Sequence, residues 1–178
     1  MELERYQTEQ QSENAYLFYS EGENGYFPML VSVDRVFENK QIFNLALLVL
    51  DKRGKWSDRI ETKNGDDEKI LATAGVIGLE FLAQNPDATL IAAGTVIKDK
   101  DGNDLPRKRT RKYQMGINKY HDFLSQHYDI RALVADKDGK GNILGKYPNW
   151  TGRWEIFRER TNYDAFLLSL KKEVEEQV

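Results

Sequence analysis

The stretch Asp66-Asp-Glu-Lys-Ile-Leu-Ala-Thr-Ala-Gly-Val-Ile-Gly-Leu-Glu-Phe-Leu-Ala-Gln84 decides the fold of this 178-residue chain. Its apolar residues recur at the spacing of one helical face, and the carboxylates of Asp66 and Asp67 suit a helix N-terminus. The remaining sides are also largely apolar, so we expect a central helix that is covered on more than one side. Asn85-Pro86 should end it, because proline disfavours helix at the preceding residue.

The residues before this helix predict an antiparallel meander. Pro28 lacks a backbone donor, so its strand should lie at a sheet edge or contain a bulge at Pro28. The segment 42–50 is almost continuously apolar and should be covered on both faces. Four strands are expected here, at residues 15–20, 26–33, 42–50 and 56–61.

The residues after the helix predict a strand at 89–97 and a second helix at about 110–126. Strands at 129–135 and 143–147 should flank a turn at 136–142. Residues 154–170 favour a hairpin, although 161–164 could instead open a helix. The predicted fold is therefore α+β, with a curved, mostly antiparallel sheet packed on the 66–84 helix and the second helix alongside. Residues 1–170 should form one domain, and residues 171–178 a charged tail.

Composition places the chain among ordinary globular proteins, with 40% hydrophobic and 31% charged residues. It contains no cysteine, which excludes disulfides, thiolate zinc sites and cysteine nucleophiles. The N-terminus is polar, and the longest apolar run, Leu45–Leu50, is too short to span a bilayer. We therefore expect a cytoplasmic protein without a membrane partner.

Asp-Lys-x-Gly sequences recur at Asp51, at 99–102 and at 136–139. Each lies between two apolar segments, so we interpret them as hairpin turns. Neither longer copy completes a calcium loop, which needs a glutamate at its twelfth position. The two histidines, His121 and His127, do not stack on one helical face. We expect no metal and no cofactor.

The densest acidic group lies near the start of the 66–84 helix. Such carboxylates could hold a divalent metal or act as general acid and base, with Asp66 and Asp67 as catalytic candidates. The alternative, which we favour, is helix capping with exposed charge. The group contains Asp58, Glu61, Asp66, Asp67 and Glu68.

The segment Pro106–Lys112 is strongly basic, although the chain has a net charge of −3. Its side chains could grip phosphates, and Tyr113 follows as an aromatic residue for stacking. A solvated loop is the alternative of nearly equal weight. The predicted nucleic-acid or phosphate-binding residues are Arg107, Lys108, Arg109, Arg111, Lys112 and Tyr113.

Several segments together resemble an uncharacterised bacterial family, a domain of unknown function. In that family a Gly-Ser-Thr-type strand end runs quickly into an Arg-Thr-Arg-x-Tyr segment, whereas here Val96–Pro106 separates the two. The resemblance supports the extent of the domain and implies no chemistry. It rests on Asn64–Thr73, Gly94-Thr95 and Arg107–Ile117, and also on Tyr16–Gly22, Phe43–Ala46 and Asn162–Leu167.

Two functions of different classes follow from these motifs. The first is a nucleic-acid or polyanion-binding protein that uses the basic segment, in a bacterial toxin–antitoxin, defence or mobile-element system. The second is an enzyme that acts on a phosphate-bearing substrate. In that enzyme Asp66 or Asp67 would be the base or metal ligand, Thr95 would orient the substrate, and Arg109 and Arg111 would steady the phosphate charge. The enzyme requires Asp66, Thr95 and Arg111 to meet in one pocket, whereas the binding protein requires an open basic surface.

Overall fold

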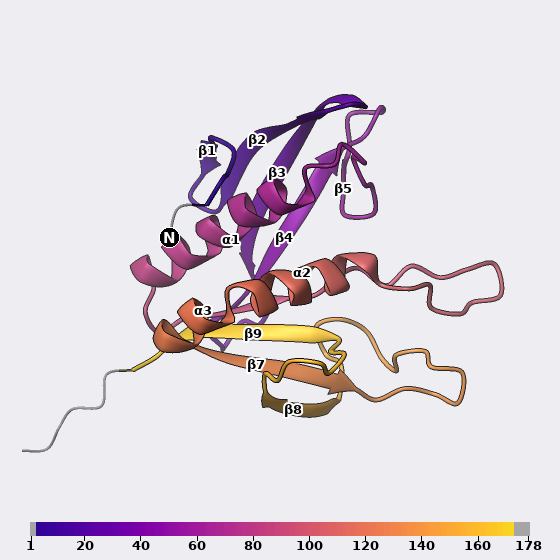
Figure 1. Cartoon of the computed structure of the whole chain (residues 1–178). Helices are drawn as coiled ribbons and strands as arrows, with labels where there is room; N and C mark the ends of the chain where they lie inside the picture. Colours follow the sequence, from indigo (N-terminus) through magenta and orange to yellow (C-terminus); the bar gives the residue numbers. More distant parts are fainter. Residues whose placement is uncertain (1–2, 173–178) are drawn as a thin grey trace, which may run out of the picture.

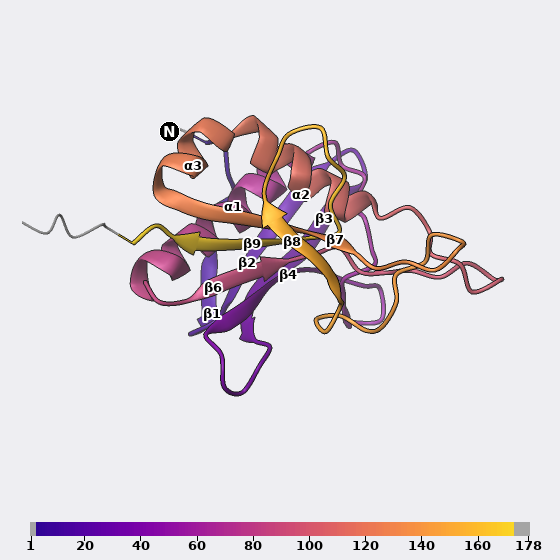
Figure 2. The same cartoon turned by 90° about the horizontal axis from the view of Figure 1, so that it is seen from below.

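A mostly antiparallel sheet of nine strands carries three helices on one of its faces (Figures 1 and 2). This computed structural model describes residues 3–172. The α+β class predicted from the sequence is confirmed. Along the sheet the strand order is β1-β2-β3-β4-β6-β9-β7-β8, and β5 pairs with β4 beside this path. The elements are β1 (Glu9–Ser12), β2 (Ala15–Gly22), β3 (Gly25–Arg35), β4 (Ile42–Leu50), β5 (Trp56–Ser57), α1 (Asp67–Gln84), β6 (Thr89–Ala92), α2 (Lys108–Lys119), α3 (His121–His127), β7 (Tyr128–Ala135), β8 (Gly152–Ile156) and β9 (Ala165–Leu170).

The predicted hairpin is present as β2 and β3, and it continues into β4. The prediction of an edge strand or a bulge around Pro28 is wrong, because β3 lies between β2 and β4 in regular register. Pro28 precedes the first β3–β4 pair, Met29 with Val49, so no β4 partner stands opposite it. The predicted strand at 56–61 is only the two-residue β5, and β1 was not expected.

The helix α1 has the predicted extent and packs on the sheet. Ile70, Ala74 and Ile77 are buried in the largest core cluster, together with residues of β2, β3 and β4. A Cβ atom at Gly78 would touch side chains of β4 and β6, which shows how closely the helix approaches the sheet. The opposite side of α1 is less covered, and Gly75 is exposed. The core therefore lies mainly between α1 and the first half of the sheet.

Among residues 3–172, the only parallel pair joins β4 to β6, and α1 forms the crossover between them. The parallel pairing is short and joins Ile42–Asn44 of β4 to Thr89–Ile91 of β6. The predicted strand at 89–97 ends early, at Ala92, because the chain then turns towards α2. There a Cβ atom at Gly94 would lie 2.7 Å from the backbone nitrogen of Thr110, an approach that only glycine permits.

The second half of the sheet corrects two predictions. The predicted hairpin within residues 154–170 is wrong, because β8 and β9 lie on opposite sides of β7 and pair with it instead of with each other. Residues 143–147 form no strand and contribute one isolated bridge, from Ile143 to Lys137. The second helix begins slightly earlier than predicted and is interrupted at Tyr120, which separates α2 from α3.

Three turns share one geometry, as expected from the repeated sequence. In each, an aspartate Oδ1 accepts backbone N–H groups two and four residues later, at 2.8 to 3.0 Å. The fourth residue is a glycine with φ between 76° and 82°. The third turn lies two residues later than predicted, at 138–141 instead of 136–139. The aspartate–glycine pairs are Asp51 with Gly54, Asp99 with Gly102, and Asp138 with Gly141.

Most of the tail predicted at residues 171–178 lies outside the described residues, which end at Lys172. Within the part of the chain that the structure describes, no helix has the length and apolar character needed to cross a membrane.

Candidate functional site

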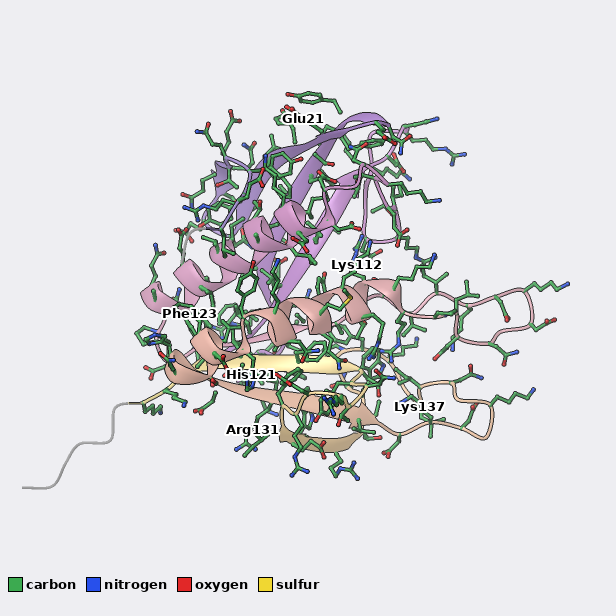
Figure 3. The ribbon with its side chains drawn as sticks, viewed as in Figure 1. Glu21, Lys112, His121, Phe123, Arg131 and Lys137 are labelled. Carbon is green, nitrogen blue, oxygen red and sulfur yellow. The ribbon has the colours of Figure 1, made fainter. Side chains whose placement is uncertain are left out.

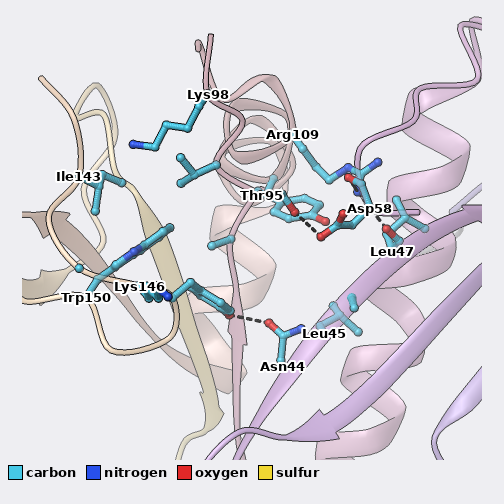
Figure 4. A pocket seen from close by; sticks show the side chains of 17 residues that line it. Asn44, Leu45, Leu47, Asp58, Thr95, Lys98, Arg109, Ile143, Lys146 and Trp150 are labelled. Atoms are coloured by element: carbon cyan, nitrogen blue, oxygen red, sulfur yellow. Dashed lines mark hydrogen bonds between the residues drawn. The ribbon is translucent and has the colours of Figure 1, made fainter. Parts of the chain in front are cut away.

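A cavity of about 430 Å³ opens where β4 and β6 separate (Figure 4). The two strands pair only as far as Asn44 and Ile91, and beyond this point β4 and the segment after β6 diverge. Clefts at the carboxyl ends of parallel strands are common ligand sites in sheets with helical crossovers. The lining side chains belong to Asn44, Leu45, Ala46, Leu47, Asp58, Ala93, Thr95, Val96, Lys98, Arg109, Tyr113, Ile143, Lys146, Tyr147 and Trp150, with Gly94 and Gly145 completing the wall.

Arg109, in the first turn of α2, joins β4 to the segment that follows β5 on one side of the fork. Its guanidinium donates to the carbonyl oxygens of Leu47 at 2.9 Å, Asp58 at 2.6 Å and Ile60 at 3.1 Å. The planar guanidinium offers several donors in a fixed arrangement, so it can satisfy carbonyls that have no neighbouring strand. These partners are neutral, and the positive charge of Arg109 therefore still acts on the cavity.

Thr95 and Asp58 form a second bridge across the fork. The Thr95 hydroxyl donates to Asp58 Oδ2 at 2.5 Å. Behind them, the N–H of Gly94 donates to Thr110 Oγ1 at 2.8 Å, which fixes this segment to the first turn of α2. The cavity therefore contains one carboxylate that holds a hydroxyl group, close to one guanidinium.

Two tyrosines contribute hydroxyl groups to the cavity. Burial raises the pKa of Tyr147, and the neighbouring Tyr113 raises it further. Burial also raises the pKa of Tyr113, although the charge of Arg109 acts in the opposite direction. Both phenols are therefore neutral near pH 7. The Tyr147 hydroxyl donates to Oδ1 of Asn44.

The mouth of the cavity carries two lysines. Lys98 forms an ion pair with Asp104, whereas Lys146 is exposed and pairs with no carboxylate among residues 3–172. Two projecting loops meet here, since the N–H of Asp104 donates to Asn142 Oδ1 at 2.7 Å and that of Ile143 to Asp104 Oδ2 at 2.8 Å. These bonds fix the rim beside the lysines.

The acidic candidates at the start of α1 lie outside this cavity. Asp66 Oδ2 accepts hydrogen bonds from the hydroxyls of Tyr6 at 2.6 Å and Ser20 at 2.7 Å, and its side chain makes no helix-capping bond. Asp67 is largely exposed and forms an ion pair with Lys112 at 3.0 Å. The expected meeting of Asp66, Thr95 and Arg111 in one pocket is therefore wrong.

The basic segment is used mainly inside the molecule. Arg107 forms an ion pair with the buried Asp164 and lies over the ring of Trp150, 5.7 Å from its centroid. Arg111 donates to Gln114 Oε1 at 2.7 Å, to Asn162 Oδ1 at 3.0 Å and to the carbonyl of Tyr163. Burial and the nearby Arg107 lower the pKa of Arg111. Of the six predicted binding residues, Arg109 and Tyr113 line the cavity and Lys108 is exposed.

The sequence interpretation missed much of the cavity. Asn44 comes from β4 and had no feature to mark it. Lys146, Tyr147 and Trp150 come from a segment interpreted partly as a strand, although its dense aromatic residues were a usable signal. Within residues 3–172 no three acidic or histidine side chains gather in a way that could hold a metal ion.

The match of the chain to a known family covers nearly its full length, from residue 2 to residue 171. The chain belongs to DUF6934, a family of unknown function. The resemblance noted from its motifs is thus confirmed at the level of the family. No curated protein and no solved structure matches the chain. Membership in DUF6934 supplies no activity, so the function has to be argued from the cavity.

Proposed function

We propose that this member of DUF6934 binds a small, ring-containing anionic molecule, of the phosphate-bearing kind, in the cavity between β4 and β6. The observation that carries the proposal is the composition of the cavity wall. Apolar and aromatic side chains make most of it, and the charged groups are three cations and one carboxylate, namely Lys98, Arg109, Lys146 and Asp58.

The size and character of the cavity support a small ligand. Binding sites for small molecules commonly measure about 300 to 1,000 Å³ and are mostly apolar, with a few placed polar groups. The cavity of about 430 Å³ lies within this range. Its cations suit an anionic group, because hydrogen bonds from charged donors to phosphate oxygens are among the stronger polar contacts. Its neutral tyrosine hydroxyls can orient the uncharged part of the ligand.

A grip on a nucleic-acid backbone has less support from the same residues. Such a grip needs several exposed cations that neutralise successive phosphates. Arg107, Arg109 and Arg111 instead direct their guanidinium groups to internal carbonyl and carboxylate oxygens. Lys112 forms an ion pair with Asp67 on α1. This leaves Lys108 as the exposed cation of the segment, which favours a single small anion over a polyanion.

Titration of the purified chain, followed by tryptophan fluorescence, tests the proposal, because Trp150 lines the cavity. The probes are a nucleoside monophosphate, the same nucleoside without phosphate, and inorganic phosphate. We expect the monophosphate to bind most tightly, since it alone offers both the ring and the charge. Lys146→Ala should weaken it roughly tenfold, the size of one charged hydrogen bond. Lys140→Ala, an exposed lysine at a nearby loop tip, is the matched control.

A single-stranded oligonucleotide at low salt provides the competing arm. Tighter binding of the oligonucleotide than of the monophosphate, with a loss of affinity in Lys108→Ala but not in Lys146→Ala, would favour the polyanion function. Equal affinity of wild type and Lys146→Ala for the monophosphate would contradict the cavity as its site.

An enzymatic role has one specific observation in its favour, the contact between Asp58 and Thr95. A carboxylate that accepts the proton of a hydroxyl is the arrangement in which a general base activates an oxygen nucleophile. In the enzymatic alternative, Asp58 thus replaces Asp66 as the candidate general base. In such a reaction Thr95 Oγ would take the phosphoryl group as the nucleoside leaves, and water would then release inorganic phosphate. Release of nucleoside and phosphate by the wild type, abolished in Thr95→Val while binding persists, would support it. Binding without turnover in the wild type would leave the chain as a binding protein.

A further inference from the structure

The sheet has a second face that the three helices do not cover (Figure 2). Over β7 and β9 this face is covered by the segment 136–151, where Ile143 and Trp150 pack against Leu133 and Ala165. Over β2, β3 and β4 the situation differs, because the outward side chains of these strands belong to none of the three core clusters of the described residues. The prediction that residues 42–50 are covered on both faces is therefore wrong for the part of β4 around Leu48, whereas Asn44 is contacted by Tyr147.

The middle of this uncovered area, the open face, is apolar, and the exposed carboxylates on the same side of the sheet, Glu9 and Asp34, lie at its margins. The register places Leu17, Leu30 and Leu48 in one row across the three strands. An antiparallel sheet that faces water normally alternates apolar with polar residues, so a leucine row on the outer face is a departure that needs a cover. Of the outward residues of the open face, Tyr19 is exposed, Ser32 is buried, and the others are partly buried, namely Leu17, Pro28, Leu30, Ala46, Leu48 and Leu50.

Opposite charges border the open face at one end of the sheet. Glu21 and Glu23 lie at the turn from β2 to β3, and Figure 3 shows Glu21 at the tip of this hairpin. The exposed turn 51–55, which follows β4, carries Lys52, Arg53 and Lys55. Since β2 and β4 both run antiparallel to β3, their two turns lie at the same end, on opposite sides of β3. The open face thus has an acidic flank and a basic flank.

This arrangement selects a second copy of the same chain as the partner. A two-fold axis that runs along β3 brings the open faces of two copies together and places β2 of one over β4 of the other. The acidic flank of each copy then meets the basic flank of its partner, twice in the dimer. Symmetric self-association requires such a self-complementary surface.

We propose that two copies of this chain form a symmetric dimer through the open face, sheet against sheet. The leucine rows form the centre of the interface, and the charged flanks set its orientation. Sheets that pack face to face keep their strands nearly aligned, at about 30°, which suits an axis along the strands. The leucine row does not line the cavity, although Ala46 at the margin of the open face does.

Sedimentation velocity over a wide range of protein concentration measures the dimer directly. Wild type should sediment as a dimer, and Leu30→Lys should raise the dissociation constant about a hundredfold or more, since it places a charge at the centre of the interface. Far-ultraviolet circular dichroism checks that the variant remains folded. A monomeric wild type would overturn the proposal, whether the open face then bound another protein or nothing.

A charge exchange tests the orientation with exposed residues alone. Glu21→Lys with Glu23→Lys makes both flanks basic, and Arg53→Glu with Lys55→Glu makes the opposite change. Each double variant should dimerise weakly by itself, whereas an equimolar mixture of the two should dimerise as well as wild type. Lys100→Glu with Lys140→Glu, at the tips of the two projecting loops, should leave the dimer intact. A mixture that stays monomeric would overturn the proposed axis.

Discussion

Two polar regions of the molecule hold different parts of the fold. The Asn64 cluster, made by Tyr6, Ser20, Thr62, Asn64 and Asp66, ties the start of α1 to the β2–β3 turn and to the N-terminal segment. The arginine segment, residues 107–111, ties the two halves of the sheet to each other. Both were candidates for chemistry, and in both the side chains bind other parts of the chain.

The difference lies in the distance that each region spans within the fold. In the Asn64 cluster, Asn64 Oδ1 accepts the N–H of Asn24 at 2.9 Å, and its Nδ2 donates to the carbonyl of Gly25 at 3.0 Å. These two hydrogen bonds stabilise the β2–β3 turn. In the arginine segment, Arg109 reaches β4 while Arg107 reaches Asp164, next to β9. Removing contacts of the Asn64 cluster should therefore destabilise the fold locally, whereas removing contacts of the arginine segment should destabilise the whole sheet.

The largest effect is expected from Asp164→Ala. Asp164 is 4% exposed, forms ion pairs with Arg107 and Lys137, and accepts the N–H of Ala135 at 2.8 Å. Its loss leaves the nearly buried guanidinium of Arg107 without its carboxylate partner, which costs about 3 to 5 kcal/mol. Chemical denaturation should show this loss in one global transition. An effect below about 1 kcal/mol would mean that the halves are held together elsewhere.

The same variant should respond differently to acid. Burial raises the pKa of Asp164. Hydrogen bonds from Lys137 and Ala135 and the charge of Arg107 lower it by more than burial raises it, so the net pKa lies below the ordinary 3.8. A carboxyl with a lowered folded-state pKa stabilises the fold above its ordinary pKa and loses this contribution as the pH falls. The stability difference between wild type and Asp164→Ala should therefore shrink below pH 3.8.

A smaller and local effect is expected from Asn64→Ala. The variant leaves the buried Ser20 hydroxyl without one partner and frees the β2–β3 turn, at a cost of about 1 to 3 kcal/mol. Hydrogen exchange should quicken at Asn24 and its neighbours, while amides in β7 and β9 keep their relative protection. Uniform acceleration across both halves would remove the contrast between the two regions.

The smallest effect is expected from Lys112→Ala. Its ion pair joins a partly exposed lysine to the exposed Asp67, and ion pairs at the surface contribute at most about 1 kcal/mol. Thermal unfolding should therefore change little. A loss comparable with that of Asn64→Ala would show that the contact between α1 and α2 contributes more to the joining of the halves than its exposure indicates.

Local sequence patterns predicted those parts of the fold that depend on neighbours in the chain. The apolar spacing of α1 and the Glu21–Gly25 turn have local causes, and both were found correctly. The position of β9 between β6 and β7 was not predicted, because the pairing of strands depends on residues far apart in sequence. The same applies to the site. Thr95, Arg109 and Tyr113 were selected from two neighbouring motifs, whereas Asn44 and Tyr147 join them only through folding.

The contacts of Arg109 show most clearly why the sequence did not predict the role of the basic segment. A basic run predicts phosphate binding because the donors are visible in the sequence. Backbone carbonyl acceptors are present at every residue and therefore leave no mark. The carbonyl of Leu47 can accept from Arg109 because β4 loses its neighbour at the fork, and those of Asp58 and Ile60 because the chain forms no strand after β5.

The strand order also has a consequence for synthesis on the ribosome. β9 is the last strand in the sequence, yet it lies between β6 and β7 and is the link through which the two halves of the sheet pair. A nascent chain that has completed β7 must wait for β9 to be translated. At about 5 to 20 residues per second, the intervening residues take roughly 2 to 7 seconds. During this interval one edge each of β6 and β7 remains unpaired, and such edges invite pairing with other chains. Molecular chaperones that shield nascent strands should therefore matter more for the yield of this protein than for a sheet whose strands pair in the order of their synthesis.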